Sequence, residues 1–216
     1  MKCPQCSAPN APKVTHCASC GFSSERLRRS LGDQWVRLER ITDAAHCLRL
    51  EDYQRCEVEM DDFERLLPQA FFAVYLGMLP AGLRVAELGF WLLNQGAFNT
   101  PLVQKRNDFG IVLVLDQAVR ELSLTFGYAI ESYFDEVTQR RLLQRAAKQL
   151  KFQDYGAAIR GLIQDSLAVL QRHAKRQLRE PLYSGIIPEI MVQPLRGGVP
   201  MPQTGRRQSV GGRHSS

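Results

Sequence analysis

Apolar residues along the middle of this chain recur with two different periods. Residues 50–67 place apolar side chains three and four positions apart, which predicts a helix with one buried face. The uninterrupted apolar run 70–79 predicts a strand buried on both faces, and 83–95 returns to helical spacing. A second buried run, 110–115, and an alternating segment, 119–126, predict two further strands.

The order of these elements predicts an architecture. A strand, a helix and a second strand in this order form a parallel crossover unit, and the turn at Asp116 and Gln117 brings the third strand back as a hairpin. Two amphipathic segments, 135–149 and 154–178, predict closing helices. Because strands that are apolar on both faces need cover on both faces, we expect an α/β fold around a small mixed sheet.

Four cysteines at the start of the chain form two Cys-x-x-Cys pairs, Cys3 with Cys6 and Cys17 with Cys20, ten residues apart. Each pair makes a tight turn that presents two sulfurs to one ion, so the spacing predicts a four-thiolate zinc site. Protein groups fill all four coordination positions, which indicates a structural ion and not a catalytic one. The alternatives are two idle pairs or a disulfide framework, and disulfides need an oxidising compartment.

Changes in composition divide the 216 residues into four parts. We expect a zinc ribbon over 1–24, a linker helix over 25–36, an α/β domain over 37–179, and a tail over 180–216 that is mostly disordered. We expect no leader before the first cysteine, and the longest apolar run is shorter than the about 20 residues that span a bilayer. We therefore expect a cytoplasmic protein without a membrane span, whose two remaining cysteines stay reduced.

The net charge of +6 comes from the two ends of the chain. Two lysines before residue 25 and four arginines after residue 194 have no acidic neighbours in those segments, and 25–193 holds 22 basic and 22 acidic residues. Only 140–179 is strongly basic, with ten cations against two acids. We expect a solvated helical face there, and the alternative is a surface that docks an acidic partner or nucleic acid. Nucleic acid is an unexpected partner, because exposed aromatic residues are not interleaved with these cations.

A cluster of acidic residues lies beside the predicted hairpin. Asp108 precedes the second strand, and Glu131 and Asp135 follow the third. Because the start of one hairpin strand lies beside the end of the other, we expect Asp108 to approach 127–131. Clustered carboxylates repel one another unless a cation or proton neutralises them, so this corner is a candidate site for a divalent ion. The alternative is capping, since Asp135 stands where a helix begins.

These segments together resemble the TPM domain family, the phosphatase-like domain of thylakoid-lumen, photosystem II repair and receptor-regulator proteins. The resemblance covers about 41–173 and depends on the order and spacing of six short motifs. In chain order they are Thr42-Asp43-Ala44, Phe71-Phe-Ala-Val-Tyr-Leu76, Glu87-Leu-Gly-Phe-Trp-Leu-Leu-Asn94, Asn107-Asp108-Phe109-Gly110 with the strand after it, Phe126-Gly127-Tyr128 with Glu131 and Asp135, and Phe152-Gln-Asp154-Tyr155.

The resemblance implies a three-layer α/β/α sandwich, a calcium site and, for some members, weak acid phosphatase activity. On the matching positions its acidic residues are Asp43, Asp108, Glu131 and Asp135. This chain departs from the family at Phe109, where an Asn usually follows the Asp, and in lacking an export or membrane segment. Free calcium is scarce in the cytosol, so we expect the corner to hold magnesium or no ion, and to bind Ca²⁺ or Mg²⁺ only weakly.

Two functions remain open at this point. The leading hypothesis is a non-catalytic interaction protein in which the zinc ribbon and the TPM-like body each offer a docking surface to an unidentified protein partner. The alternative is a metal-dependent phosphomonoesterase, in which the carboxylates hold an ion and Lys105 or Arg106 neutralises phosphate charge. No nucleophile elbow and no phosphate-binding glycine loop appears in the sequence. This favours the first hypothesis.

Overall fold

The computed structural model describes residues 2–11, 14–99 and 107–179, without the side chains of 177–179. Every element named below falls within these ranges. The predicted disordered tail and the loop cations Lys105 and Arg106 lie outside the described residues.

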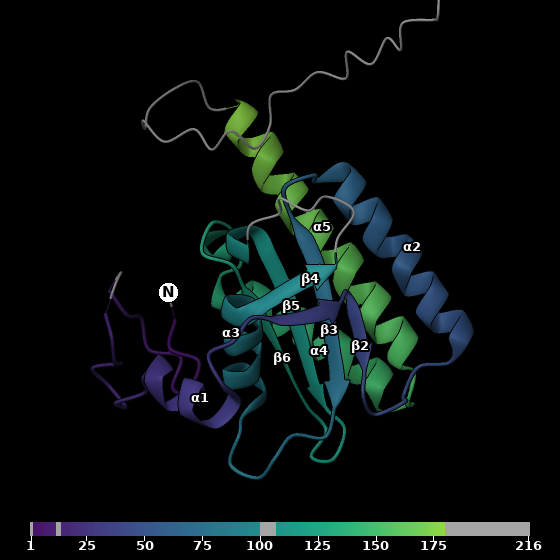
Figure 1. The fold of residues 1–216 in the computed structure, drawn as a ribbon. Helices are drawn as coiled ribbons and strands as arrows, with labels where there is room; N and C mark the ends of the chain where they lie inside the picture. The colour runs from purple at the N-terminus through teal and green to yellow at the C-terminus, as the bar shows by residue number, and fades with distance from the viewer. Residues whose placement is uncertain (1, 12–13, 100–106, 180–216) are drawn as a thin grey trace, which may run out of the picture. The chain divides into compact units, whose positions relative to one another are not determined.

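A four-stranded mixed sheet forms the middle layer of the α/β body (Figure 1). Its strands, in spatial order, are β2 (Ile41–Asp43), β3 (Phe71–Gly77), β5 (Gly110–Asp116) and β6 (Glu121–Phe126). The first three are parallel, and β6 pairs antiparallel with β5 as the predicted hairpin. The strands with uninterrupted apolar sequences, β3 and β5, take the two central positions, where helices cover both faces of a strand.

Helices cover both faces of this sheet. The first face packs against α2 (Leu50–Leu66), α4 (Glu136–Leu150) and α5 (Tyr155–Arg179), and the second against α3 (Val85–Gln95). Successive strand residues point to opposite faces, so the central strands divide their side chains between two cores. Phe72, Val74, Ile111 and Leu113 belong to the first core, and Phe71, Ala73, Val112 and Val114 to the second. The predicted three-layer α/β/α architecture is confirmed.

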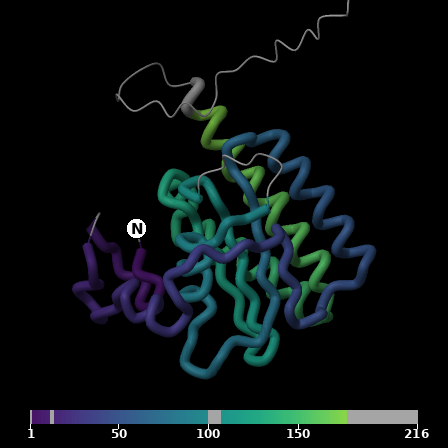
Figure 2. The backbone as a smooth tube through the Cα atoms, in the orientation of Figure 1, coloured from purple at the N-terminus to yellow at the C-terminus, as the bar shows by residue number. Residues whose placement is uncertain are grey.

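The segment between the cysteines and the sheet contains one helix and one short strand. The helix α1 (Ser24–Leu31) contacts α3, and Figure 2 traces the N-terminal backbone alongside the α3 segment. It ends earlier than the predicted linker helix because Gly32 adopts a φ of 91°, which ends the helical path. The strand β1 (Val36–Glu39) then pairs in parallel with β4 (Gly96–Asn99) as a separate two-stranded sheet.

The three strands β1, β2 and β4 are absent from the sequence-based prediction. Each has only three or four residues, which is too short to show a period. Gly96 follows the last residue of α3 as predicted, but its φ of −80° is extended backbone that begins β4 and not a left-handed helix cap. Among the described helices, none combines the length and the apolar character needed to cross a membrane.

Candidate metal centre

The four N-terminal cysteines converge on one point. Their sulfur atoms all lie within 4.8 Å of one another, with Cys3 and Cys17 buried and Cys6 and Cys20 exposed. The Sγ atoms of Cys3 and Cys20 are 3.6 Å apart, as are those of Cys6 and Cys17. Both distances are far longer than the roughly 2.05 Å of a disulfide bond. The four thiols therefore form a group that could hold one metal ion.

Two similar turns produce this convergence. In the first, the amide of Cys3 donates to Ala8 and the amide of Ser7 donates back to Cys3. In the second, Cys17 donates to the carbonyl of Phe22, and Gly21 donates back to Cys17. Ser7 (φ 59°) and Gly21 (φ 71°) occupy the same left-handed position in the two turns. The repetition at a spacing of 14 residues explains why each pair presents its sulfurs in the same way.

Four thiolates cannot coexist at this distance without a cation, and the thiol pKa values reflect this. Burial acts to raise the pKa of Cys17, but the backbone amides of Cys20 and Ser19 and the thiols of Cys6 and Cys3 outweigh it and lower the pKa to about 6. For Cys20 the amide of Phe22 lowers the pKa, but burial and the three neighbouring thiols raise it to about 12. Burial also raises the pKa of Cys3. Cys17 ionises readily, whereas the raised pKa values of Cys3 and Cys20 disfavour their thiolates, so a divalent cation is needed to hold all four sulfurs as ligands.

The sulfur geometry suits a small tetrahedral ion. Bonds of about 2.3 Å from Zn²⁺ to four sulfurs at tetrahedral angles place the sulfurs roughly 3.8 Å apart. The 3.6 Å separations in the two cross-pairs come close to that value. The donor set of four soft sulfurs therefore fits the ion that the sequence predicts.

The cysteine element, residues 2–24, is bound to the α/β body through α3. Phe22 packs edge-on against Phe90, with the ring centroids 5.9 Å apart. The guanidinium of Arg26, at the start of α1, lies 2.9 Å from the carboxylate of Glu87, which is fully buried. Phe22 and Leu27 are themselves buried in the core that contains α3. The element is part of one hydrophobic core and does not stand apart from the body.

The predicted acidic corner brings Asp108 and Glu131 to one cavity. Asp108 belongs to the 3₁₀ turn η1 (Asn107–Phe109) and Glu131 to η2 (Glu131–Tyr133), and both line a cavity of about 180 Å³. Gly127 permits their approach, because a Cβ there would lie 2.2 Å from the Asp108 carbonyl oxygen. The amide of Ala129 donates to that same oxygen at 3.0 Å. The expectation that Asp108 approaches 127–131 is confirmed.

The cysteine element closes this corner. The backbone amide of Lys2 donates to the Oε1 atom of Glu131 at 2.9 Å. Lys2, Cys3 and Pro4 line the same cavity as Asp108 and Glu131. The corner is therefore the place where the first residues of the metal element meet the body.

The other two predicted acidic ligands hold backbone amides. The Asp43 carboxylate accepts from the amides of Cys47 (3.0 Å) and Leu48 (2.8 Å). Asp135 caps α4 by accepting from the amide of Thr138 at 2.7 Å, and hydrogen bonds from the Thr138 side chain and from this amide lower the pKa of Asp135. Among the described residues, the four acidic side chains do not form a group with ligand atoms within 4.8 Å, and only the four cysteines do. Binding of a divalent ion at the corner remains a prediction.

Sequence reasoning missed the residues that attach the metal element. Lys2, Arg26 and Glu87 act through contacts between segments distant in the chain. One signal was present: a glutamate at the third position of an otherwise apolar helix must find a donor, and Glu87 does so with Arg26 and with the Arg84 amide.

Comparison with known proteins adds little to the fold and the site described above. No protein-family model and no curated protein matches the chain. Among solved structures, the N-terminal domain of a protein from P. gingivalis has 17% identity and a TM-score of 0.48, with 63% of this chain and 84% of that one covered. The BA42 protein of the psychrophilic bacterium Bizionia argentinensis has 11% identity and a TM-score of 0.49, with 58% and 83% covered. Both scores fall below 0.5, so the fold assignment rests on the strand order and helix packing described above.

Proposed function

We propose that this chain is a non-catalytic interaction protein, in which a structural zinc ion held by Cys3, Cys6, Cys17 and Cys20 stabilises a docking element on a TPM-like body. The sulfur separations and the soft donor set support zinc. The α/β/α layers and the approach of Asp108 to Glu131 are in keeping with the TPM resemblance. Reduced thiols and zinc thiolate chemistry suit a reducing compartment such as the cytoplasm.

The observation that carries this proposal is the contact of the chain's own N-terminal residues with the acidic corner. In the TPM resemblance this corner is where an ion and a substrate phosphate would bind. Here Glu131 accepts from the Lys2 amide, and the residues around Cys3 line the cavity. Phe109, which replaces the usual Asn, packs against the core instead of offering a polar ligand. The corner thus serves to attach the metal element.

The surface offered to a partner is then the outer side of the cysteine element. Cys6 and Cys20 are exposed there, and Val14 is an apolar side chain left half exposed. Because such a small element has little core of its own, the bound zinc supplies most of its folding free energy. We infer that zinc fixes the shape of this surface and takes no part in chemistry.

A phosphatase assay separates this proposal from the alternative, a metal-dependent phosphomonoesterase. Hydrolysis of an aryl phosphate is followed between about pH 5 and 8 with Mg²⁺, with Ca²⁺ and with a chelator. We expect no turnover above that of the Asp108→Ala variant. A turnover number near the enzyme median of about 10 per second, lost in Asp108→Ala, would establish the phosphatase instead.

Zinc itself is tested by metal analysis of the purified protein. We expect one zinc per chain and loss of that zinc in Cys6→Ser. Cys47→Ser is the matched control, because Cys47 is a partly buried thiol outside the group of four. Zinc retained at one equivalent in Cys6→Ser would contradict the proposal.

A further inference from the structure

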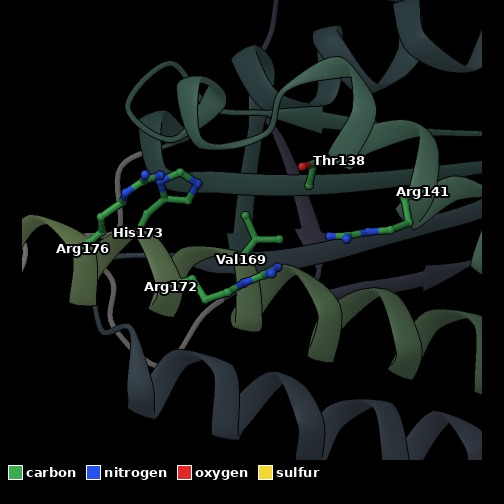
Figure 3. Close-up of a pocket in the computed structure, with 6 residues that line it drawn as sticks. All are labelled: Thr138, Arg141, Val169, Arg172, His173 and Arg176. Atoms are coloured by element: carbon green, nitrogen blue, oxygen red, sulfur yellow. The ribbon is translucent and has the colours of Figure 1, made fainter.

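A second cavity lies between α4 and α5 and has a volume of about 270 Å³ (Figure 3). Its lining consists of two residues of α4 and four residues of α5: Thr138, Arg141, Val169, Arg172, His173 and Arg176. The α5 residues are spaced three, four and seven positions apart, which places them on one face of the helix. None of the six lines the cavity at the acidic corner.

Among the described side chains of α4 and α5, the pocket arginines differ from the other arginines in that no carboxylate lies within ion-pair distance of them. Arg140, Arg145 and Arg160 form ion pairs with Glu136, Asp165 and Asp52, at 2.7, 2.7 and 3.0 Å. In the described part of the chain, no carboxylate lies within 4.0 Å of the guanidinium groups of the three pocket arginines, Arg141, Arg172 and Arg176. Three like charges around one hollow repel one another, so this arrangement favours the binding of an anion.

The side chains are placed to bind such an anion from several sides. In Figure 3, Arg141 from α4 and Arg172 from α5 extend toward one another over Val169. His173 packs against Tyr133, with the ring centroids 5.0 Å apart, and this contact restrains its ring. Arg141 acts electrostatically on the carboxylate of Asp135. That carboxylate already accepts a hydrogen bond from the Thr138 amide. The planar fork of a guanidinium matches the oxygens of phosphate and can bind two of them at once.

We propose that this pocket binds a phosphate group, either as inorganic phosphate or as the end of a small phosphomonoester. Three arginines supply enough positive charge for a doubly charged tetrahedral anion. The volume of about 270 Å³ lies just below the roughly 300–1,000 Å³ of pockets for drug-sized ligands, so it suits a phosphate with little attached to it. Single-stranded nucleic acid is disfavoured because the lining holds none of the Phe, Tyr or Trp side chains on which bases stack. This site is independent of the proposed function.

The test is calorimetric titration of the full chain with inorganic phosphate and, separately, with glycerol 2-phosphate. Ionic strength is held at about 0.15 M with chloride, so that screening is constant, with a Debye length of about 8 Å. The pocket variant is Arg141→Gln with Arg172→Gln. The matched control, Lys148→Gln with Lys175→Gln, removes two exposed charges from the same helices outside the pocket. Thr138→Val is a milder variant that removes one hydroxyl without changing charge.

We expect one saturable site for each probe. Because each lost guanidinium removes charge-assisted hydrogen bonds, the dissociation constant should rise about tenfold or more in the pocket variant. In the control it should stay within about twofold, since neither lysine lines the pocket and salt screens exposed charges. Tighter binding of glycerol 2-phosphate would assign the site to an organic phosphate, and equal binding to the phosphate ion.

Equal phosphate affinity in the parent and the pocket variant, or no saturable binding of either probe by the parent, would overturn the proposal. Should the double variant fail to fold, as judged by circular dichroism, an unchanged dissociation constant in Thr138→Val and in Arg176→Gln would overturn it as well. Tighter binding of a uridine oligonucleotide than of glycerol 2-phosphate, lost in the pocket variant, would replace it with a nucleic-acid surface.

Discussion

Replacing Cys6 with serine should destabilise the α/β body as well as remove the metal. The reason is that Phe22 and Leu27, at 6% and 2% exposure, belong to the same core as α3. Burying such a side chain contributes about 1.5–3 kcal/mol, so two of them contribute roughly 3–6 kcal/mol. This is an upper value, because an unfolded chain already buries part of its apolar surface. If the cysteine element unfolds without its metal, and α1, which follows it directly, comes away from α3 with it, the body loses much of this contribution.

The melting temperature measures this loss. In a chain of this size, each kcal/mol changes the melting temperature by about 2–4 °C, so we expect a fall of roughly 6–24 °C in Cys6→Ser. The assay is a far-ultraviolet circular dichroism melt of the parent, of Cys6→Ser and of the Cys47→Ser control, with zinc content measured on the same samples. If Cys6→Ser lost its zinc and still melted within about 2 °C of the parent, the element would not be coupled to the body and this reasoning would fail.

A second variant separates two effects: the loss of the contact between the cysteine element and α3, and the loss of the metal. Phe22→Ala leaves all four cysteines in place, so zinc content should stay at one per chain. Removing a buried Phe typically costs about 3–5 kcal/mol, and the body should melt at a lower temperature. A variant that kept both its zinc and its melting temperature would show that the contact between Phe22 and Phe90 contributes nothing to stability.

Three further predictions concern the body. Gly127→Ala should lower the free energy of unfolding by about 1–3 kcal/mol or more, because its Cβ would lie 2.2 Å from a backbone oxygen that cannot move away. Gly161→Ala should raise the free energy of unfolding by about 0.5–1 kcal/mol, because there is open space for the added Cβ inside α5. Urea unfolding of the two variants and the parent measures both changes. Arg40→Gln should cost about 3–5 kcal/mol in the same assay, since it removes a cation 3.2 Å from the buried Glu64, and a loss below about 1 kcal/mol would contradict this. Asp108→Ala should weaken the response of the melting temperature to millimolar Ca²⁺ or Mg²⁺, and an unchanged response would exclude the corner as an ion site.

The helices and strands with a clear apolar pattern could be predicted from the sequence. The helical spacing of Cys56, Met60 and Phe63 placed α2 within a residue or two of its observed ends. The apolar runs of β3 and β5 identified the two central strands. These predictions succeed because periodicity reports which faces of an element are buried. The cysteine spacing succeeds for a related reason: two turns of the same design have to present their sulfurs together.

The groups that contact the acidic side chains of the candidate site could not be predicted from the sequence. The sequence predicts Glu131 as a metal ligand, which stays a prediction, but it does not predict that the Oε1 atom of Glu131 accepts from the amide of Lys2, 129 positions away. For Asp135 the alternative of helix capping describes its contact with Thr138. A carboxylate in a sequence shows a need for positive charge or N–H donors, but the sequence alone does not show which of these meets it.

The contacts between the cysteine element and α3 have a consequence for the order in which the chain folds. The element has all four of its cysteines once Cys20 has been made, because they lie within 18 residues. Its docking surface requires α3, which ends at Gln95, and the sheet, which is complete only at Phe126. At about 5–20 residues per second, synthesis takes roughly 5–20 seconds between these two points. During that interval Phe22 has no partner on α3, so a nascent chain presents this aromatic side chain to solvent until α3 and the sheet have formed.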